Sequence, residues 1–239
     1  MKQTNLLTIA LAILLIACTN INTSTVTING TITNPKGDVV EFRMKDTTYS
    51  TTLNKDNTFS ISIDIDSAVY LSFYHGQESS AMYLNGGENV NITIDTDLFD
   101  ETITYEGSIE SSFLAIKYLL EEKGNFYDDL FSTPKDEYIA NLDLFKTEGF
   151  ALIETLENKN FAESEKKDMD RMYQFFSEKI DAVANMPKIG EPAIDFTYHD
   201  KDGNELSLST FNGSLVYVDV WATWCGPCKT EIPALKQLE

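Results

Sequence analysis

The first half of the chain alternates apolar and polar residues with a period of two. In the clearest run, Phe59, Ile61, Ile63 and Ile65 are separated by Ser60, Ser62 and Asp64. This period places the apolar side chains on one face of a half-buried strand. Further short strands are predicted at residues 26–28, 31–33, 39–44, 51–53, 69–74, 83–84 and 90–94. Strands at this spacing predict a small antiparallel β-sandwich or barrel over residues 25–107.

Helical periodicity replaces this pattern over residues 108–186. Ser108 is a suitable N-cap and Gly124 a suitable C-terminal stop for a first helix. A second helix is expected to open at Thr133-Pro134, with proline at the first helical position, and Gly149 is expected to kink or interrupt it. A third helix is predicted over residues 162–185. The expected apolar faces are Ile109, Phe113, Ile116 and Leu120; Tyr138, Leu142, Phe145, Ile153 and Leu156; and Met169, Met172, Phe176, Ile180 and Val183. We interpret these faces as core, and the helices carry no recognisable catalytic constellation.

A short apolar run, Leu6–Ala17, begins the chain behind the positive charge of Lys2. It has the length of a signal-peptide core and is too short for a spanning helix. The run ends in L-I-A-C at residues 15–18, which resembles the bacterial lipobox. The resemblance implies a lipoprotein signal peptide at residues 1–17, lipid attachment at Cys18 and a tether at residues 18–24. An ordinary signal peptide or an N-terminal anchor is the alternative.

The charge balance limits the partners. The chain has 18 basic and 38 acidic residues, which gives a formal net charge of −20. Phosphate backbones are bound by basic surfaces, so this balance argues against nucleic acid as a partner. The acids are spread along the sequence, which indicates a solvated surface rather than an acidic binding patch. The chain also has three cysteines, which is too few for a disulfide framework.

Residues 187–239 carry the predicted chemistry. The run Val216–Val220 predicts a buried strand that leads into Cys225-Gly226-Pro227-Cys228. A strand, a tight turn and a helix start would place both thiols at a helix N-terminus, where partial positive charge and free N–H groups stabilise a thiolate. We therefore expect the pKa of Cys225 to lie below the ~8.5 of a free thiol. Pro227 suits the first helical turn, where its missing N–H costs nothing.

W-C-G-P-C after V-D-V-W-A resembles thioredoxin. The longer stretch from I-G-E-P-A at residues 189–193 through Phe196 to Pro233, with a hairpin turned at residues 202–204, resembles the TlpA and ResA-like thiol-disulfide oxidoreductases. The resemblance implies that residues 187–239 are the first part of a thioredoxin-like α/β domain, so that the whole chain is α+β. It implies that Cys225 is the nucleophile, Cys228 the resolving thiol and Asp219 a buried carboxylate that assists proton transfer. The residues that support the motif are Trp224, Gly226, Pro227 and Pro233.

The resemblance also implies a function. It predicts a lipid-anchored, periplasm-facing oxidoreductase that reduces disulfide-bearing envelope proteins, apocytochrome c among them, with electrons from a donor protein and without a metal or an organic cofactor. Thr19 after the lipobox favours the outer over the inner membrane. Residues 25–186 resemble, more loosely, a domain of unknown function found before thioredoxin domains. Because the sequence ends inside the first helix of the thioredoxin-like domain, we expect this chain to be weakly active or inactive and its full-length parent to be active.

Three alternatives compete with this interpretation. A lone C-x-x-C can be half of a zinc site, but the sequence has no second C-x-x-C, and His75 and His199 are remote in sequence. A peroxiredoxin-like peroxidase shares the opening G-x-P-A-x-D-F, but it needs proline and Thr or Ser where this chain has Val218 and Ala222. The third is a non-enzymatic envelope lipoprotein whose β-rich domain binds a partner. His199 is interpreted as a surface residue, and Trp221 as core.

Overall fold

The computed structural model describes residues 24–187 and 190–237, and the chain divides into two compact units after Ala184. The signal peptide, Cys18 and most of the tether lie outside the described residues. Within those residues, no helix is both long enough and apolar enough to cross a membrane. The two units are described separately.

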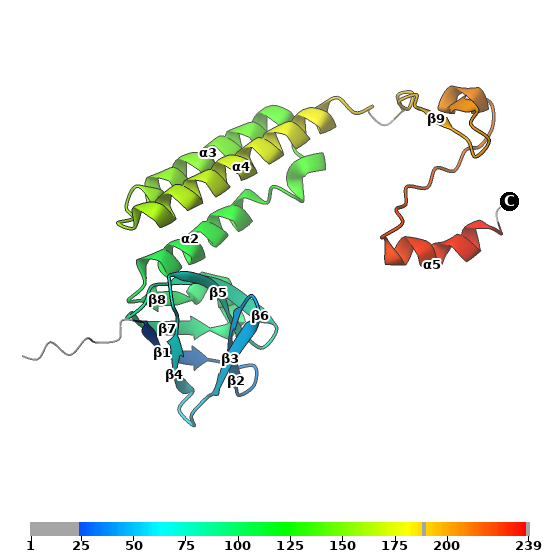
Figure 1. Ribbon diagram of the computed structural model, residues 1–239. Coiled ribbons are helices and arrows are strands. Elements are labelled where there is room, and N and C mark those ends of the chain that lie inside the picture. The colour runs from blue at the N-terminus through cyan, green and yellow to red at the C-terminus, as the bar shows by residue number, and fades with distance from the viewer. Residues whose placement is uncertain (1–23, 188–189, 238–239) are drawn as a thin grey trace, which may run out of the picture. The chain divides into compact units, whose positions relative to one another are not determined.

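The first unit begins with a β-sandwich of two four-stranded sheets. Its strands are β1 (Thr25–Thr33), β2 (Val39–Met44), β3 (Thr47–Thr52), β4 (Thr58–Asp64), β5 (Val69–His75), β6 (Glu78–Leu84), β7 (Asn89–Asp95) and β8 (Thr104–Glu106). One sheet has the order β4-β1-β7-β8 and the other β3-β2-β5-β6 (Figure 1). The inward residues of both sheets form one core, in which Ile28, Phe42 and Phe73 are fully buried. Of the alternating run, Phe59, Ile63 and Ile65 are buried in this core, whereas Ile61 is only partly buried.

The expected all-antiparallel arrangement is wrong for one pair of strands, because β1 and β7 run parallel. After β1 the chain adds β2 and β3 to the second sheet, returns with β4 antiparallel to β1, and adds β5 and β6 to the second sheet. It then returns with β7, which lies on the other side of β1 and runs in the same direction. A parallel pair needs such a long crossover, and no local pattern reveals it. The strands predicted at residues 26–28 and 31–33 form one continuous strand, β1, with Gly30 inside it. A Cβ at Gly30 would come within 2.4 Å of the Phe59 ring, so glycine allows this ring to pack against the strand.

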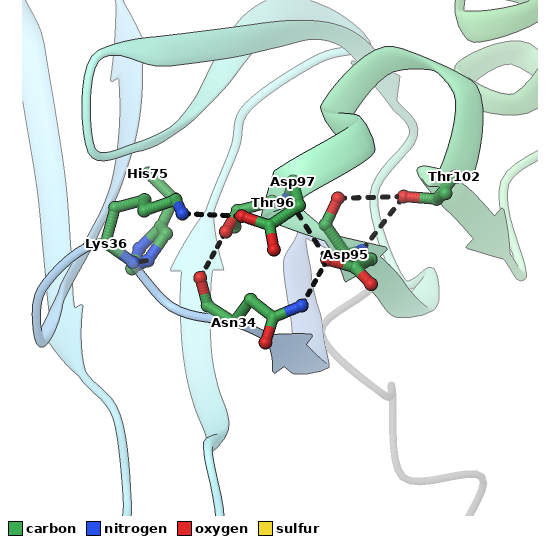
Figure 2. A network of polar contacts seen from close by, with 7 residues as sticks. All are labelled: Asn34, Lys36, His75, Asp95, Thr96, Asp97 and Thr102. Carbon is green, nitrogen blue, oxygen red and sulfur yellow. Dashed lines mark hydrogen bonds and ion pairs between the residues drawn. The ribbon is translucent and has the colours of Figure 1, made fainter.

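A polar network fastens the β1–β2 loop to the end of β7 (Figure 2). His75 is buried; its Nε2 accepts the Lys36 backbone N–H at 2.9 Å and its Nδ1 lies 3.0 Å from the Val39 carbonyl oxygen. Lys36 Nζ pairs with Asp97 at 2.6 Å, in the turn η1 (Thr96–Leu98) that precedes the short helix α1 (Phe99–Thr102). Asn34 Nδ2 donates to Asp95 Oδ1 at 2.9 Å. Both ring nitrogens of His75 are thus used to hold the fold.

Three long helices complete the first unit. They are α2 (Ile109–Gly124), α3 (Lys135–Ile153) and α4 (Lys159–Ala184), with a short turn η2 (Asp129–Phe131) before α3. Figure 1 shows α3 and α4 side by side. The predicted N-cap is confirmed, because Ser108 Oγ accepts the Ser111 N–H at 3.3 Å. Asn125, with φ of 44°, ends α2 directly after Gly124.

Three details of the helix prediction are wrong. Pro134 is the N-cap of α3 rather than its first residue, because its ψ of 140° is extended. Gly149 does not interrupt α3; a Cβ there would meet Met169 Cε at 2.0 Å, so the glycine lets α3 and α4 approach each other. Ile109 and Ile116 are exposed, because the buried face of α2 contains Leu114 and Ala115 beside the predicted Phe113.

Buried polar contacts join the helices to the sandwich. Glu165 of α4 is only 2% exposed; it accepts a hydrogen bond from the Tyr70 hydroxyl of β5 at 2.7 Å and pairs with Lys117 of α2 at 2.8 Å. Ser108 and Ser111 at the start of α2 each donate to the Tyr83 carbonyl of β6 at 3.0 Å. The β-rich and helical segments therefore pack as one unit.

The second unit contains β9 (Thr197–His199), β10 (Glu205–Ser207), η3 (Leu208–Phe211) and α5 (Gly226–Leu235). The predicted hairpin is confirmed: β9 and β10 are antiparallel, and Gly203 turns with φ of +84°. The predicted buried strand at Val216–Val220 is wrong, since this segment is exposed and irregular. A strand needs a hydrogen-bonding neighbour and covered faces, and residues 190–237 supply neither. No residue in that range is buried.

Candidate redox site

The two cysteines of the C-x-x-C motif are joined. Cys225 and Cys228 form a disulfide across a Cα–Cα distance of 5.4 Å. Cys225 is the N-cap of α5, and its Sγ accepts the backbone N–H of Cys228 at 3.3 Å. The motif therefore lies where the sequence predicted it, at the start of a helix.

The first turn of α5 explains this position. The Cys225 carbonyl accepts the Lys229 N–H at 3.2 Å, which is the first hydrogen bond of the helix. Pro227 occupies the first turn, where no intrahelical partner for an N–H exists. The free N–H groups and the helix dipole of such a turn favour a negative charge on the N-cap sulfur. The geometry can thus stabilise a Cys225 thiolate once the disulfide is opened.

The turn just before the motif is closed by a hydrogen bond between backbone atoms. The Cys225 N–H donates to the Ala222 carbonyl at 3.0 Å, which closes the turn from Ala222 to the helix. Sequence reasoning did not identify this role for Ala222, because a contact through a backbone carbonyl leaves no signal in the side chain. Pro233 lies inside α5, which continues to Leu235.

Both tryptophans around the motif are exposed. Trp224 is 86% exposed, and Trp221 is 54% exposed. The interpretation of Trp221 as core is therefore wrong here, because the segment before it is not covered by other elements. The exposed indole of Trp224 directly precedes Cys225, the candidate nucleophile.

Asp219 is exposed rather than buried. It lines a groove of about 550 Å³ together with aromatic residues of the hairpin, Phe196 and Tyr198, and with the irregular segment 216–218. His199 is exposed, as predicted, and lines the same groove. The buried environment implied for Asp219 is absent, and its part in proton transfer stays a prediction. In the described part of the chain, no three His, Cys, Asp or Glu side chains converge as a metal site.

Comparison with known proteins now adds to this geometry. The AhpC/TSA family matches residues 189–239, which include the disulfide. The chain is 41% identical over 64 residues to the thiol-disulfide oxidoreductase ResA of Geobacillus thermodenitrificans; the alignment covers 27% of this chain and 34% of ResA. It is 35% identical over 68 residues to the thioredoxin-like protein YneN of Bacillus subtilis, with 28% and 38% covered. The C-terminal unit is therefore similar to ResA-like thiol-disulfide oxidoreductases and to a thioredoxin-like protein.

The extent of this TlpA/ResA-like likeness is limited. The chain spans about a third of the length of the curated relatives it matches. No solved structure matches the chain significantly. The mixed helix and sheet content agrees with the α+β class predicted from the sequence.

Proposed function

We propose that this chain is part of a thiol-disulfide oxidoreductase that reduces protein disulfides through Cys225 and Cys228. The observation that carries the proposal is the Cys225–Cys228 disulfide at the N-terminus of α5, with Cys225 as the N-cap. The names of the ResA relatives support the same reaction class. Gly226-Pro227 is also the spacer of reducing thioredoxins, which favours the reductive direction.

In the proposed reaction, the Cys225 thiolate attacks one sulfur of a substrate disulfide. This forms a Cys225–substrate disulfide and releases the other substrate sulfur as a thiolate, which takes up a proton. The Cys228 thiolate then attacks Cys225 Sγ, releases the second substrate sulfur and forms the Cys225–Cys228 disulfide. Two electrons pass to the substrate, and a donor protein with a dithiol returns them by the same exchange.

The proposed location is the bacterial cell envelope. The L-I-A-C sequence at residues 15–18 supports lipid attachment at Cys18. Several acyl chains on that residue would anchor the protein stably. Thr19 supports the outer membrane. The substrates would then be disulfide-bearing proteins of the envelope, apocytochrome c included.

The test is disulfide reduction by this chain and by the longest form that its gene encodes. With dithiothreitol as electron source and insulin as substrate, Cys225→Ser should abolish turnover. Cys228→Ser should accumulate a mixed disulfide at Cys225, visible by mass spectrometry. If Cys228→Ser traps no substrate while Cys225→Ser does, the two roles are reversed. If the longest form with both cysteines reduces nothing, the proposal is wrong.

A peroxidase is the second candidate, because the AhpC/TSA family matches the same residues. Val218 and Ala222 stand where the peroxidase motif needs proline and Thr or Ser. We therefore expect no consumption of hydrogen peroxide above that of the Cys225→Ser variant. Peroxide consumption that depends on Cys225 would favour the peroxidase.

A further inference from the structure

A groove between β8 and α2 lies on the first unit, whose described residues include no cysteine. Its lining includes Ile103, which precedes β8, Tyr105 of β8, and Ser112, Ala115, Ile116 and Leu119 of α2. Its volume is about 450 Å³, which lies within the usual range of ligand sites. Ser112 Oγ donates to the Tyr105 carbonyl at 2.7 Å, so the outward carbonyl of β8 is already satisfied.

The floor of the groove is apolar and partly uncovered. Ile103, Tyr105 and Ala115 are buried, whereas Ile116 is 44% exposed in the middle of α2. An apolar patch bounded by charged residues is typical of an interaction site.

The rim carries unneutralised negative charge. Glu101 and Glu106 line the groove. Burial raises the pKa of nearby Asp100, and the carboxylates of Glu122, Glu78 and Glu101 raise it further. None of these five carboxylates forms an ion pair with a Lys or Arg of the described chain. The sequence indicated a solvated acidic surface, and the fold places two of its acids, Glu101 and Glu106, on an apolar groove.

We propose that this groove binds a short segment of a partner protein that carries apolar side chains together with lysine or arginine. The apolar side chains would cover Ile116 and the floor, and the cations would pair with the rim. Binding of the segment as an added β-strand beside β8 is disfavoured, because the Tyr105 carbonyl already accepts a hydrogen bond from the Ser112 hydroxyl. A metal ion is disfavoured as the occupant, because the acids are distributed along the rim and no three of them converge in the described residues.

The test uses the full chain and three fluorescent nonapeptides. One alternates Val with Lys, one alternates Val with Glu, and one alternates Ser with Lys. Fluorescence anisotropy should show binding of the Val-Lys peptide only, and its affinity should fall as salt screens the rim. Ile116→Ser should weaken binding about tenfold, consistent with loss of ~1.4 kcal/mol. The double variant Glu101→Gln with Glu106→Gln should weaken it similarly and reduce the salt dependence.

Matched variants provide the controls. Ile109→Ser removes another exposed isoleucine (57% exposed, against 44% for Ile116) from the same helix but outside the groove. Glu154→Gln with Glu157→Gln removes two exposed acids elsewhere. Both should bind as the parent does, and circular dichroism should show that every variant is folded. Equal binding of the Ser-Lys peptide, equal losses in the controls, or no binding at all would overturn the proposal. Self-association lost in Ile116→Ser would assign the groove to a second copy and also overturn it. Redox activity enters none of these readouts, so this proposal and the proposed function fail independently.

Discussion

The Glu88 side chain, between β6 and β7, has a pKa that changes when the protein folds. Glu88 is half-buried and accepts two hydrogen bonds from Asn85, from the backbone N–H at 3.1 Å and from Nδ2 at 2.8 Å. Burial raises the pKa of Glu88, the Asn85 hydrogen bonds lower it, and the Glu110 carboxylate raises it again, with a net upward shift. The ionised form of Glu88 is therefore penalised in the folded state.

This shift predicts a pH dependence of stability. A folded pKa above the unfolded value of ~4.3 means that the folded state binds more protons, so stability falls as pH rises through that window. Glu88→Gln should flatten this fall, measured as the free energy of unfolding in urea from pH 4 to pH 7. Asp56 provides the opposite case, since hydrogen bonds from Thr58 lower its pKa. Asp56→Asn should reduce the loss of stability as pH falls. A Glu88→Gln profile parallel to that of the parent would contradict the assignment.

At the scale of elements, the sequence predicted what local periodicity determines. The strand Val39–Met44 has the predicted bounds, and the N-cap Ser108 and the hairpin at residues 202–204 are where the pattern indicates them. The parallel pairing of β1 with β7 depends on residues about sixty positions apart, which no local pattern records. The segment Val216–Val220 has the composition of a strand but no neighbouring strand among residues 190–237. The same holds for the site. The sequence predicted the C-x-x-C motif at a helix start, but not the exposure of Trp221 and Asp219, which depends on what other segments cover.

The junction between the helices and the sandwich predicts a large effect of one residue. Glu165→Ala would leave Lys117 and the Tyr70 hydroxyl without their buried acceptor. Removing one partner of a buried pair costs about 3 kcal/mol, which should appear as a lower midpoint of urea unfolding. Glu163→Gln is the control, because its pair with Lys167 is exposed and should contribute less than ~1 kcal/mol. Equal losses in the two variants would show that Glu165 does not hold the helices to the sandwich.

For the whole molecule, the two units differ in how much they bury. Residues up to Ala184 enclose two apolar clusters, one in the sandwich and one among the helices. Residues 190–237 bury no side chain. Folding stability follows buried apolar area, so cooperative unfolding of this chain should report the first unit. Residues 190–237 provide no buried core to hold the redox motif in place. We therefore expect weak turnover from this chain.

The two tryptophans make this difference measurable. The sequence has two, Trp221 and Trp224, and both are exposed in the second unit. Tryptophan emission should therefore be that of solvated indole before urea is added, and it should not shift across the transition that far-ultraviolet circular dichroism records. Reduction of the Cys225–Cys228 disulfide should leave that circular dichroism transition unchanged, because the bond lies outside the unit that unfolds cooperatively. An emission maximum that begins blue-shifted and moves to the red together with the circular dichroism signal would show that residues 190–237 are covered and fold with the rest.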